Sequence, residues 1–170
     1  QFSMSDNCYY MHVWEQDYYE KIWTSQELIT VLPNIENYDS SYTVSWGKLF
    51  KRSLFDKIKF NEQRRFGEDF ECSFKLYLNM KSCLYIHKSL YNYRSHSESM
   101  VKKIRTERQL MDDVEIRFGR IPFLIGRGID PTPYIAEIKK LIQWRLDTKS
   151  DVGEGESNAM RMYQEILRNL

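Results

Sequence analysis

Residues 61–78 of this 170-residue chain are NEQRRFGEDFECSFKLYL, and this stretch decides the predicted fold. It opens with a charged loop over residues 61–67, which leads to the acidic pair Glu68 and Asp69. Apolar residues behind the pair recur at the spacing of one helix face: Phe70, Phe74, Tyr77 and Leu78. The stretch therefore predicts a helix that begins at the acidic pair.

The sequence on either side of this helix predicts short elements of both kinds. Residues 24–27 (TSQE) form a capping box that starts a short helix, and we expect Pro33 to stop it. Apolar residues spaced along 45–55 fit a helix-turn with a basic outer face. Residues 83–86 and 90–93 are short strand candidates, so this part of the chain is predicted to be α/β.

The character of the sequence changes near residue 100, where helical periodicity takes over. Helices are predicted over residues 101–118, from Asp130-Pro131 onward with Pro at the first position, and after Ser157 as a cap. We therefore expect an α/β part over residues 1–100 and a helical C-terminal subdomain over 101–170.

Composition excludes several classes of protein. A hydrophobic fraction of 42% is enough for a sizeable core, and a net charge of +1 gives no global attraction to nucleic acid. No apolar run approaches the length that spans a bilayer. The three cysteines, Cys8, Cys72 and Cys83, are widely spaced, which predicts reduced thiols in a cytosolic protein.

Residues 44–100 carry several motifs in a fixed order. WGKLF at 46–50 is followed by the Glu68-Asp69 pair, by YNYR at 91–94, and by Ser99-Met100. In this order the segment resembles the second half of a bacterial family-2 glycosyltransferase of the GT-A fold. In such enzymes a W-x-K-L-[YF] segment precedes an E-D pair, and a Y-x-Y-R segment followed by S-[IM] closes the catalytic domain.

The resemblance implies the C-terminal part of a GT-A-like (Rossmann-like) α/β catalytic domain with short strands, followed by a small helical appendage. Such enzymes hold the nucleotide sugar with an upstream half that ends in an Asp-x-Asp metal motif. The chain has no Asp-x-Asp, since the adjacent Asp112 and Asp113 fall late and in a predicted helix. We therefore expect the chain to be the acceptor-side half, inactive without a nucleotide-binding half.

The resemblance also assigns roles to residues of the first two motifs. Asp69 is implied as the catalytic base that takes the proton from the acceptor hydroxyl, with Glu68 orienting a neighbour or binding acceptor hydroxyls. Trp46 and Lys48 are implied as an acceptor-side platform, an aromatic face with a cation nearby. The structural alternatives stay open: the two acids cap the helix, and Trp46 anchors the core.

The third motif lies where a leaving diphosphate would be held. Arg94 is implied as a diphosphate contact, and His96 as a late metal ligand for the divalent Mg or Mn ion of the intact enzyme. An alternating strand over 90–93 would direct Arg94 and His96 to one side. A surface salt bridge for Arg94 and an exposed loop position for His96 are the alternatives.

The implied function is inverting transfer of a sugar from a nucleotide-diphosphate sugar to a glycan or lipid-linked acceptor. Capsule, exopolysaccharide or cell-wall synthesis is the expected setting, in the cytoplasm or at the inner face of the membrane, without nucleic acid. The basic cluster Lys102, Lys103 and Arg105 is either a solvated face or a peripheral contact with anionic lipid.

Two other functions compete with this hypothesis. One is a helical protein-interaction module without catalytic activity. The other is a metal nuclease that would use Glu68, Asp69, Glu71 and Lys75, although its carboxylates would all lie along one predicted helix. The sequence carries no signal for an oligomeric state.

Overall fold

A computed structural model describes residues 2–5, 8–11, 14–64, 66–91, 106–148 and 158–170. Two antiparallel strand pairs lie in the N-terminal part: β1 (Phe2–Ser5) with β2 (Cys8–Met11), and β3 (Glu20–Thr24) with β4 (Ser82–Ile86). Five α-helices accompany them: α1 (Ser25–Ile35), α2 (Glu68–Asn79), α3 (Glu107–Ile125), α4 (Thr132–Thr148) and α5 (Asn158–Asn169). The described part is therefore mixed α/β and mostly helical, as the α/β prediction with short strands required.

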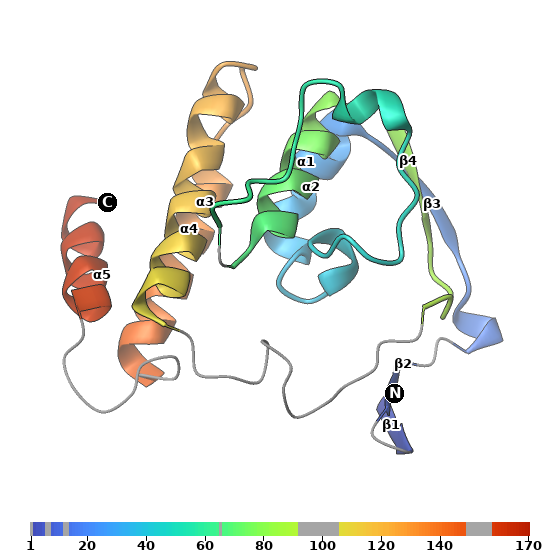
Figure 1. The fold of residues 1–170 in the computed structure, drawn as a ribbon, viewed down its shortest axis with the longest axis horizontal. Coiled ribbons are helices and arrows are strands. Elements are labelled where there is room, and N and C mark those ends of the chain that lie inside the picture. The colour runs from blue at the N-terminus through green and yellow to red at the C-terminus, as the bar shows by residue number, and fades with distance from the viewer. Residues whose placement is uncertain (1, 6–7, 12–13, 65, 92–105, 149–157) are drawn as a thin grey trace.

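The elements are arranged side by side (Figure 1). The β3–β4 pair lies at one side and packs on α1, and α1 packs on α2. Helix α3 contacts α2 and α4, and α5 packs against α3 and α4 at the opposite side of the molecule. The helical subdomain thus lies against the helix that begins with Glu68 and Asp69.

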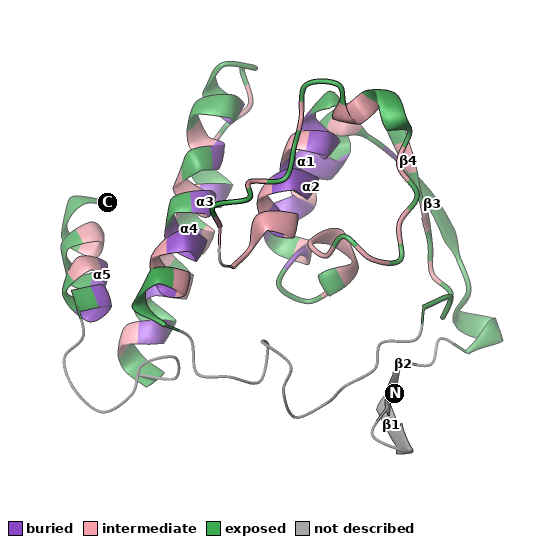
Figure 2. Ribbon diagram, viewed as in Figure 1, coloured by how far each residue is buried: buried purple, intermediate pink, exposed green. Residues whose placement is uncertain are grey.

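Two hydrophobic cores hold this arrangement together (Figure 2). The first lies among β3, α1, α2 and the ends of α3 and α4, with Leu28, Leu32, Phe74 and Leu124 almost completely buried. The second joins the first half of α3 to α4 and α5 through Leu110, Ile142 and Tyr163. Because Leu124 and Tyr134 belong to the first core, the C-terminal helices help to build it.

Buried charged side chains lie between the two cores, where they join α1, α3 and α4 through ion pairs. Glu36, just after α1, accepts two hydrogen bonds of 2.9 Å from the Arg120 guanidinium of α3. Arg117 lies between Glu36 and Asp113, and Arg145 of α4 donates to Asp113. Removing one member of such a buried set leaves an uncompensated charge, so these contacts fix how α3 and α4 dock on α1.

Helix α1 departs from the sequence prediction at its end. The capping box forms as expected, because Thr24 accepts from the Glu27 amide and Glu27 accepts from the Thr24 amide. Pro33, however, does not stop the helix, which continues to Ile35. Proline leaves the Ile29 carbonyl without its amide donor, and the hydroxyl of Tyr134 in α4 donates to that oxygen at 2.7 Å.

Two further predictions of local structure are wrong. Residues 45–55 do not form one helix-turn: irregular backbone runs to residue 51, and a short 3-10 helix covers Arg52–Phe55. Leu90 and Tyr91 are not in a strand, while residues 92–93 lie outside the described part. The strand predicted at 83–86 is confirmed by β4, whose residues pair with β3 in an antiparallel register.

The predicted C-terminal helices exist with shifted limits. Helix α3 begins at Glu107, after a Thr106 cap, and continues through Pro122 to Ile125 because Leu124 is fully buried in the first core. Helix α4 begins one residue after Pro131. Cys72 and Cys83 are free thiols, as predicted, and burial raises the pKa of both.

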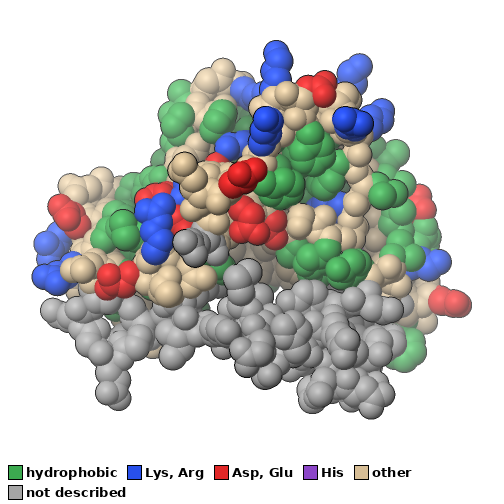
Figure 3. Space-filling model, in the orientation of Figure 1, with side chains coloured by type: hydrophobic (Ala, Val, Ile, Leu, Met, Phe, Trp, Pro, Cys, Tyr) green, Lys and Arg blue, Asp and Glu red, His purple; other side chains and the backbone are tan. Residues whose placement is uncertain are grey.

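The outer face of the β3–β4 pair is exposed and partly apolar. Ile22, Leu84 and Ile86 lie on this face, with 71% of Ile22 exposed, and hydrophobic side chains line the same side of the space-filling view (Figure 3). Across the described residues, none of the helices combines the length and apolar character that crossing a membrane requires.

Candidate active site

The acidic pair lies in the first turn of α2, as the sequence predicts. Gly67 precedes the helix with φ +77°, a left-handed backbone conformation that glycine adopts without strain. Glu68 and Asp69 are half-buried, and the Asp69 carboxylate accepts the Phe70 amide hydrogen at 2.8 Å. This bond holds the carboxylate at the helix N-terminus and leaves its second oxygen available for another partner.

The structure brings Lys48 near Asp69 although they lie on different segments. Burial lowers the pKa of Lys48 to about 8, and the charges of Asp69 and Asp39 oppose this shift. The Lys48 ammonium also donates to the Val44 carbonyl, which fixes the side chain across its own turn. The half-buried Lys48 ammonium thus offsets part of the negative charge of these two carboxylates.

Trp46 forms the aromatic part of the same region. Its ring stacks on that of Tyr91 with centroids 4.7 Å apart and planes 19° from parallel. Gly47 between Trp46 and Lys48 has φ +69°, so the chain turns sharply and separates the two side chains. Trp46 is half-buried, which suits a ring that both packs and borders a binding surface.

Asp39 is a member of this region that the sequence analysis missed. One of its oxygens accepts the Ser41 amide at 2.9 Å, and the other accepts the Tyr85 hydroxyl at 2.8 Å. Asp39 belongs to a polar loop and Tyr85 to β4, and no spacing in the sequence connects them. The signal that could have found Asp39 is its position after α1, where a short polar residue starts a 3-10 turn.

Side chains of α3 pack against the first turn of α2. The space beside Gly67 is so tight that an added Cβ would lie 2.8 Å from Ile116 Cδ1. The Arg120 guanidinium lies 3.8 Å from the centre of the Phe70 ring, directly after Asp69. The helical subdomain therefore fixes the backbone that carries the acidic pair.

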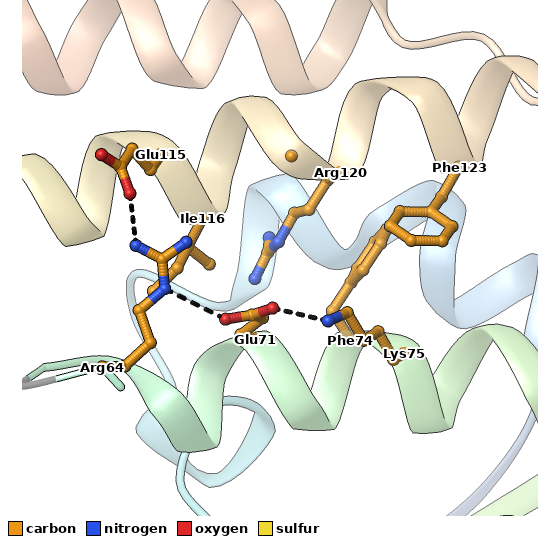
Figure 4. Close-up of a pocket in the computed structure, with 9 residues that line it drawn as sticks. Arg64, Glu71, Phe74, Lys75, Glu115, Ile116, Arg120 and Phe123 are labelled. Carbon is orange, nitrogen blue, oxygen red and sulfur yellow. Dashed lines mark hydrogen bonds and ion pairs between the residues drawn. The ribbon is translucent and has the colours of Figure 1, made fainter. Parts of the chain in front are cut away.

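A cavity of about 90 Å³ lies between α2 and α3 (Figure 4). Arg64 bridges Glu71 at 3.2 Å to Glu115 at 2.5 Å, and Lys75 also pairs with Glu71. Trp46, Lys48, Glu68 and Asp69 do not line this cavity, whereas Glu71 and Lys75 of the nuclease hypothesis do. Its charges are engaged with one another, so we interpret it as a packing space between two helices. Lys75 is thereby occupied by Glu71, which disfavours the nuclease hypothesis.

The diphosphate and metal predictions depend on residues that the structure does not describe. Arg94 and His96 lie outside the described residues. In the described part of the chain, no three His, Cys, Asp or Glu side chains converge as metal ligands. The divalent-metal hypothesis depends on His96, so it stays a prediction.

The assembled region has the chemistry of hydroxyl activation. It contains a carboxylate held at a helix N-terminus and an ammonium on which the charge of that carboxylate acts. Trp46, two residues before this lysine, adds a stacked aromatic pair with Tyr91. A carboxylate placed in this way can accept a proton from a bound hydroxyl group. Aromatic rings nearby offer flat apolar faces to a ring-shaped substrate.

Comparisons with known proteins found similarity to glycosyltransferases. No family model matches the chain. The chain is similar to proteins named as glycosyltransferases, which supports a glycosyltransferase. Glycosyltransferase GlyA of Streptococcus pneumoniae serotype 4 is 27% identical over 173 residues, which cover 99% of this chain and 25% of GlyA. Glycosyltransferase GlyG of the same organism is 29% identical over 133 residues, 76% of this chain and 43% of GlyG. The chain thus spans a quarter of one relative and less than half of the other.

Proposed function

We propose that this chain is the acceptor-side part of an inverting family-2 glycosyltransferase of the GT-A fold. The observation that carries the proposal is the placement of Asp69 in the first turn of α2, where the Phe70 amide holds its carboxylate and its charge acts on Lys48. The similarity to GlyA and GlyG along most of the chain supports the same class. The reaction moves a sugar from a nucleotide-diphosphate sugar to a glycan or lipid-linked acceptor.

Asp69 acts as the general base in this proposal. An acceptor hydroxyl binds near its free carboxylate oxygen, gives up its proton there, and attacks the anomeric carbon of the donor. The Phe70 amide holds the carboxylate in place, and Glu68 one position earlier binds or orients an acceptor hydroxyl. Attack from the face opposite the leaving group inverts the anomeric centre.

Lys48 and Trp46 contribute the environment of the base. The Lys48 ammonium interacts electrostatically with the proposed base, because the charge of Asp69 opposes the burial that lowers the pKa of Lys48. The Trp46 ring, supported by Tyr91, provides an apolar face for a sugar ring. Arg94 is proposed to contact the leaving diphosphate, and His96 to be a ligand of the divalent Mg or Mn ion.

The proposed setting follows from the same class of reaction. Nucleotide sugars serve capsule, exopolysaccharide and cell-wall synthesis, and we place the enzyme in the cytoplasm, at the inner face of the membrane. The cluster of Lys102, Lys103 and Arg105 is the proposed contact with anionic lipid.

The experiment that tests the proposal replaces Asp69 by Asn in the full-length enzyme. Asn keeps the shape and removes the base, so transfer should fall by roughly 10²- to 10⁴-fold while nucleotide-sugar binding changes little. Asp56→Asn, at an exposed carboxylate outside the site, is the matched control and should leave transfer unchanged. Full activity of Asp69→Asn would return Asp69 to a helix-capping role.

A binding measurement tests the acceptor-side assignment separately. We expect the 170-residue chain to bind uridine diphosphate weakly or not at all when magnesium or manganese is present. Titration calorimetry measures this directly. Tight stoichiometric binding by the chain itself would contradict the assignment.

A further inference from the structure

A group of four aromatic rings, Tyr19, Tyr42, Tyr85 and His87, extends from the first core to the surface; we call it the aromatic stack. The rings of Tyr42 and Tyr85 lie 5.3 Å apart and 8° from parallel. Tyr19 covers the outer end, with centroids 4.8 Å from His87 and 5.7 Å from Tyr85. Tyr19 is 49% exposed, so the stack ends in an aromatic face that is open to solvent.

The β3–β4 pairing explains why these rings meet. Trp23 lies opposite Cys83 and Lys21 opposite Tyr85, and side chains of alternate residues share one face of a strand. The ladder continues one step further, because the His87 amide donates to the Tyr19 carbonyl at 2.9 Å. Tyr19 and His87 therefore extend the core-facing side of the strand pair beyond the buried residues.

Hydrogen bonds within the stack determine which nitrogen of His87 carries a proton. The Tyr85 hydroxyl has one hydrogen, which it donates to the Asp39 carboxylate at 2.8 Å. His87 Nδ1 lies 3.0 Å from the same hydroxyl oxygen, so in this network Nδ1 is the donor. A neutral imidazole protonated at Nδ1 presents a lone pair at Nε2. No hydrogen bond among the described residues engages Nε2.

From this arrangement we propose that Tyr19 and His87 form a binding site for a pyranose ring of the acceptor glycan. The sugar lies across the edges of the two stacked rings, where its apolar C–H groups contact Tyr19 and one of its hydroxyl groups donates a hydrogen bond to His87 Nε2. Asp39 and Tyr85 are positioning residues, because they fix the tautomer without touching the sugar. This inference rests on the proposed glycosyltransferase function.

The charges around the aromatic stack and its position in the fold favour the acceptor, and not the nucleotide donor, as the ligand of Tyr19 and His87. Tyr42 of the stack accepts, through its carbonyl, a hydrogen bond of 2.9 Å from the hydroxyl of Tyr77 in α2. The aromatic stack therefore lies against the helix that begins with the proposed base for the acceptor hydroxyl. Lys21 shares this face of the strand pair, but its ammonium lies over the Trp23 ring, 3.6 Å from the centroid. The Asp39 carboxylate that accepts from Tyr85 lies beside the aromatic stack, so the stack suits a neutral sugar better than a diphosphate.

The test uses nuclear magnetic resonance of the isotope-labelled chain. The probes are the methyl β-glycosides of glucose, galactose and N-acetylglucosamine, titrated separately, with uridine diphosphate as the donor-side probe. We expect the ring signals of Tyr19 and His87 to shift with at least one glycoside and not with uridine diphosphate. Without ligand, the His87 nitrogen signals should show protonation at Nδ1.

Two variants and one control make the binding test specific. His87→Phe keeps a ring for stacking and removes Nε2, and Tyr19→Ala removes the sugar platform; each should weaken glycoside binding roughly three- to tenfold. Tyr38→Ala removes another tyrosine, 90% exposed and outside the stack, and should leave binding unchanged. Far-ultraviolet circular dichroism verifies that each variant is folded.

Several results would overturn the inference. These are protonation of His87 at Nε2, ring shifts with uridine diphosphate in place of the glycosides, no shift with any glycoside, or unchanged affinity in His87→Phe. Failure of the proposed function has a different signature, because Asp69→Asn would then retain full transfer in the full-length enzyme. The glycoside titration uses the chain with Asp69 intact, so its outcome is independent of that result.

Discussion

Tyr134 should stabilise the protein by replacing the hydrogen-bond donor that Pro33 lacks. In an uninterrupted helix the amide of residue 33 would donate to the Ile29 carbonyl, and proline has no such hydrogen. The Tyr134 hydroxyl lies 2.7 Å from that oxygen, in a side chain with 4% of its surface exposed. Tyr134→Phe removes only this hydroxyl and leaves the buried carbonyl without a partner.

The expected magnitude follows from the cost of an unsatisfied buried polar group. Tyr134→Phe should lower the free energy of unfolding by about 1–3 kcal/mol. For a chain of this size, each kcal/mol corresponds to roughly 2–4 °C in Tm. In a Pro33→Ala background the alanine amide supplies the donor, so the same substitution should cost less than about 1 kcal/mol. The two substitutions should therefore couple by about 1–2 kcal/mol.

Urea unfolding of the four proteins in this double-mutant cycle measures the coupling, with a constant m-value expected throughout. Tyr77→Phe is a matched control, because the Tyr77 hydroxyl donates to the Tyr42 carbonyl at 2.9 Å, outside any helix with proline. Its cost should be the same with Pro33 or Ala at position 33. The reasoning is refuted if Tyr134→Phe costs the same in both backgrounds.

Two further substitutions test the support of the site. Between pH 8 and 10.5 the unfolded chain holds a Lys48 proton that the folded chain has lost, because burial lowers the pKa of Lys48 from 10.5 to about 8. The free energy of unfolding should therefore rise with pH in this window relative to Lys48→Met, which urea unfolding at pH 7 and 10 measures; a constant difference would contradict the shift. Gly67→Ala combines a left-handed φ with a Cβ placed 2.8 Å from Ile116 Cδ1, and should cost about 2–4 kcal/mol. Ile116→Val removes that methyl group, so the double variant should be roughly 1 kcal/mol more stable than the sum of the single effects; strict additivity would argue against the contact.

Short-range signals in the sequence were sufficient for several elements. The Thr24–Glu27 capping box places the start of α1, and the apolar spacing after Asp69 places α2. Both signals depend on residues within a few positions of one another. The same locality explains the failure at Pro33, where a residue about a hundred positions later supplies the missing donor.

Part of the candidate site was predictable for the same reason. The acidic pair follows from its position at a helix start, and Trp46 and Lys48 follow from one motif. The proximity of Lys48 to Asp69 and Asp39 was not predictable in this way, because it depends on how the segment after α1 folds back onto α2. Asp39, Tyr85 and His87 come from a loop and a strand end, so no local pattern connects them.

By itself, the sequence determined the helices whose capping and periodicity are local, the acidic pair at the start of α2, and the resemblance to a glycosyltransferase. Tertiary structure alone decided the contacts that define the environment of the pair. These are the support of Gly67 by Ile116, the Lys48 charge beside Asp69, and the stack that ends in Tyr19 and His87. The physical reason is that burial and electrostatic attraction act between atoms that are close in space, whatever their separation along the chain.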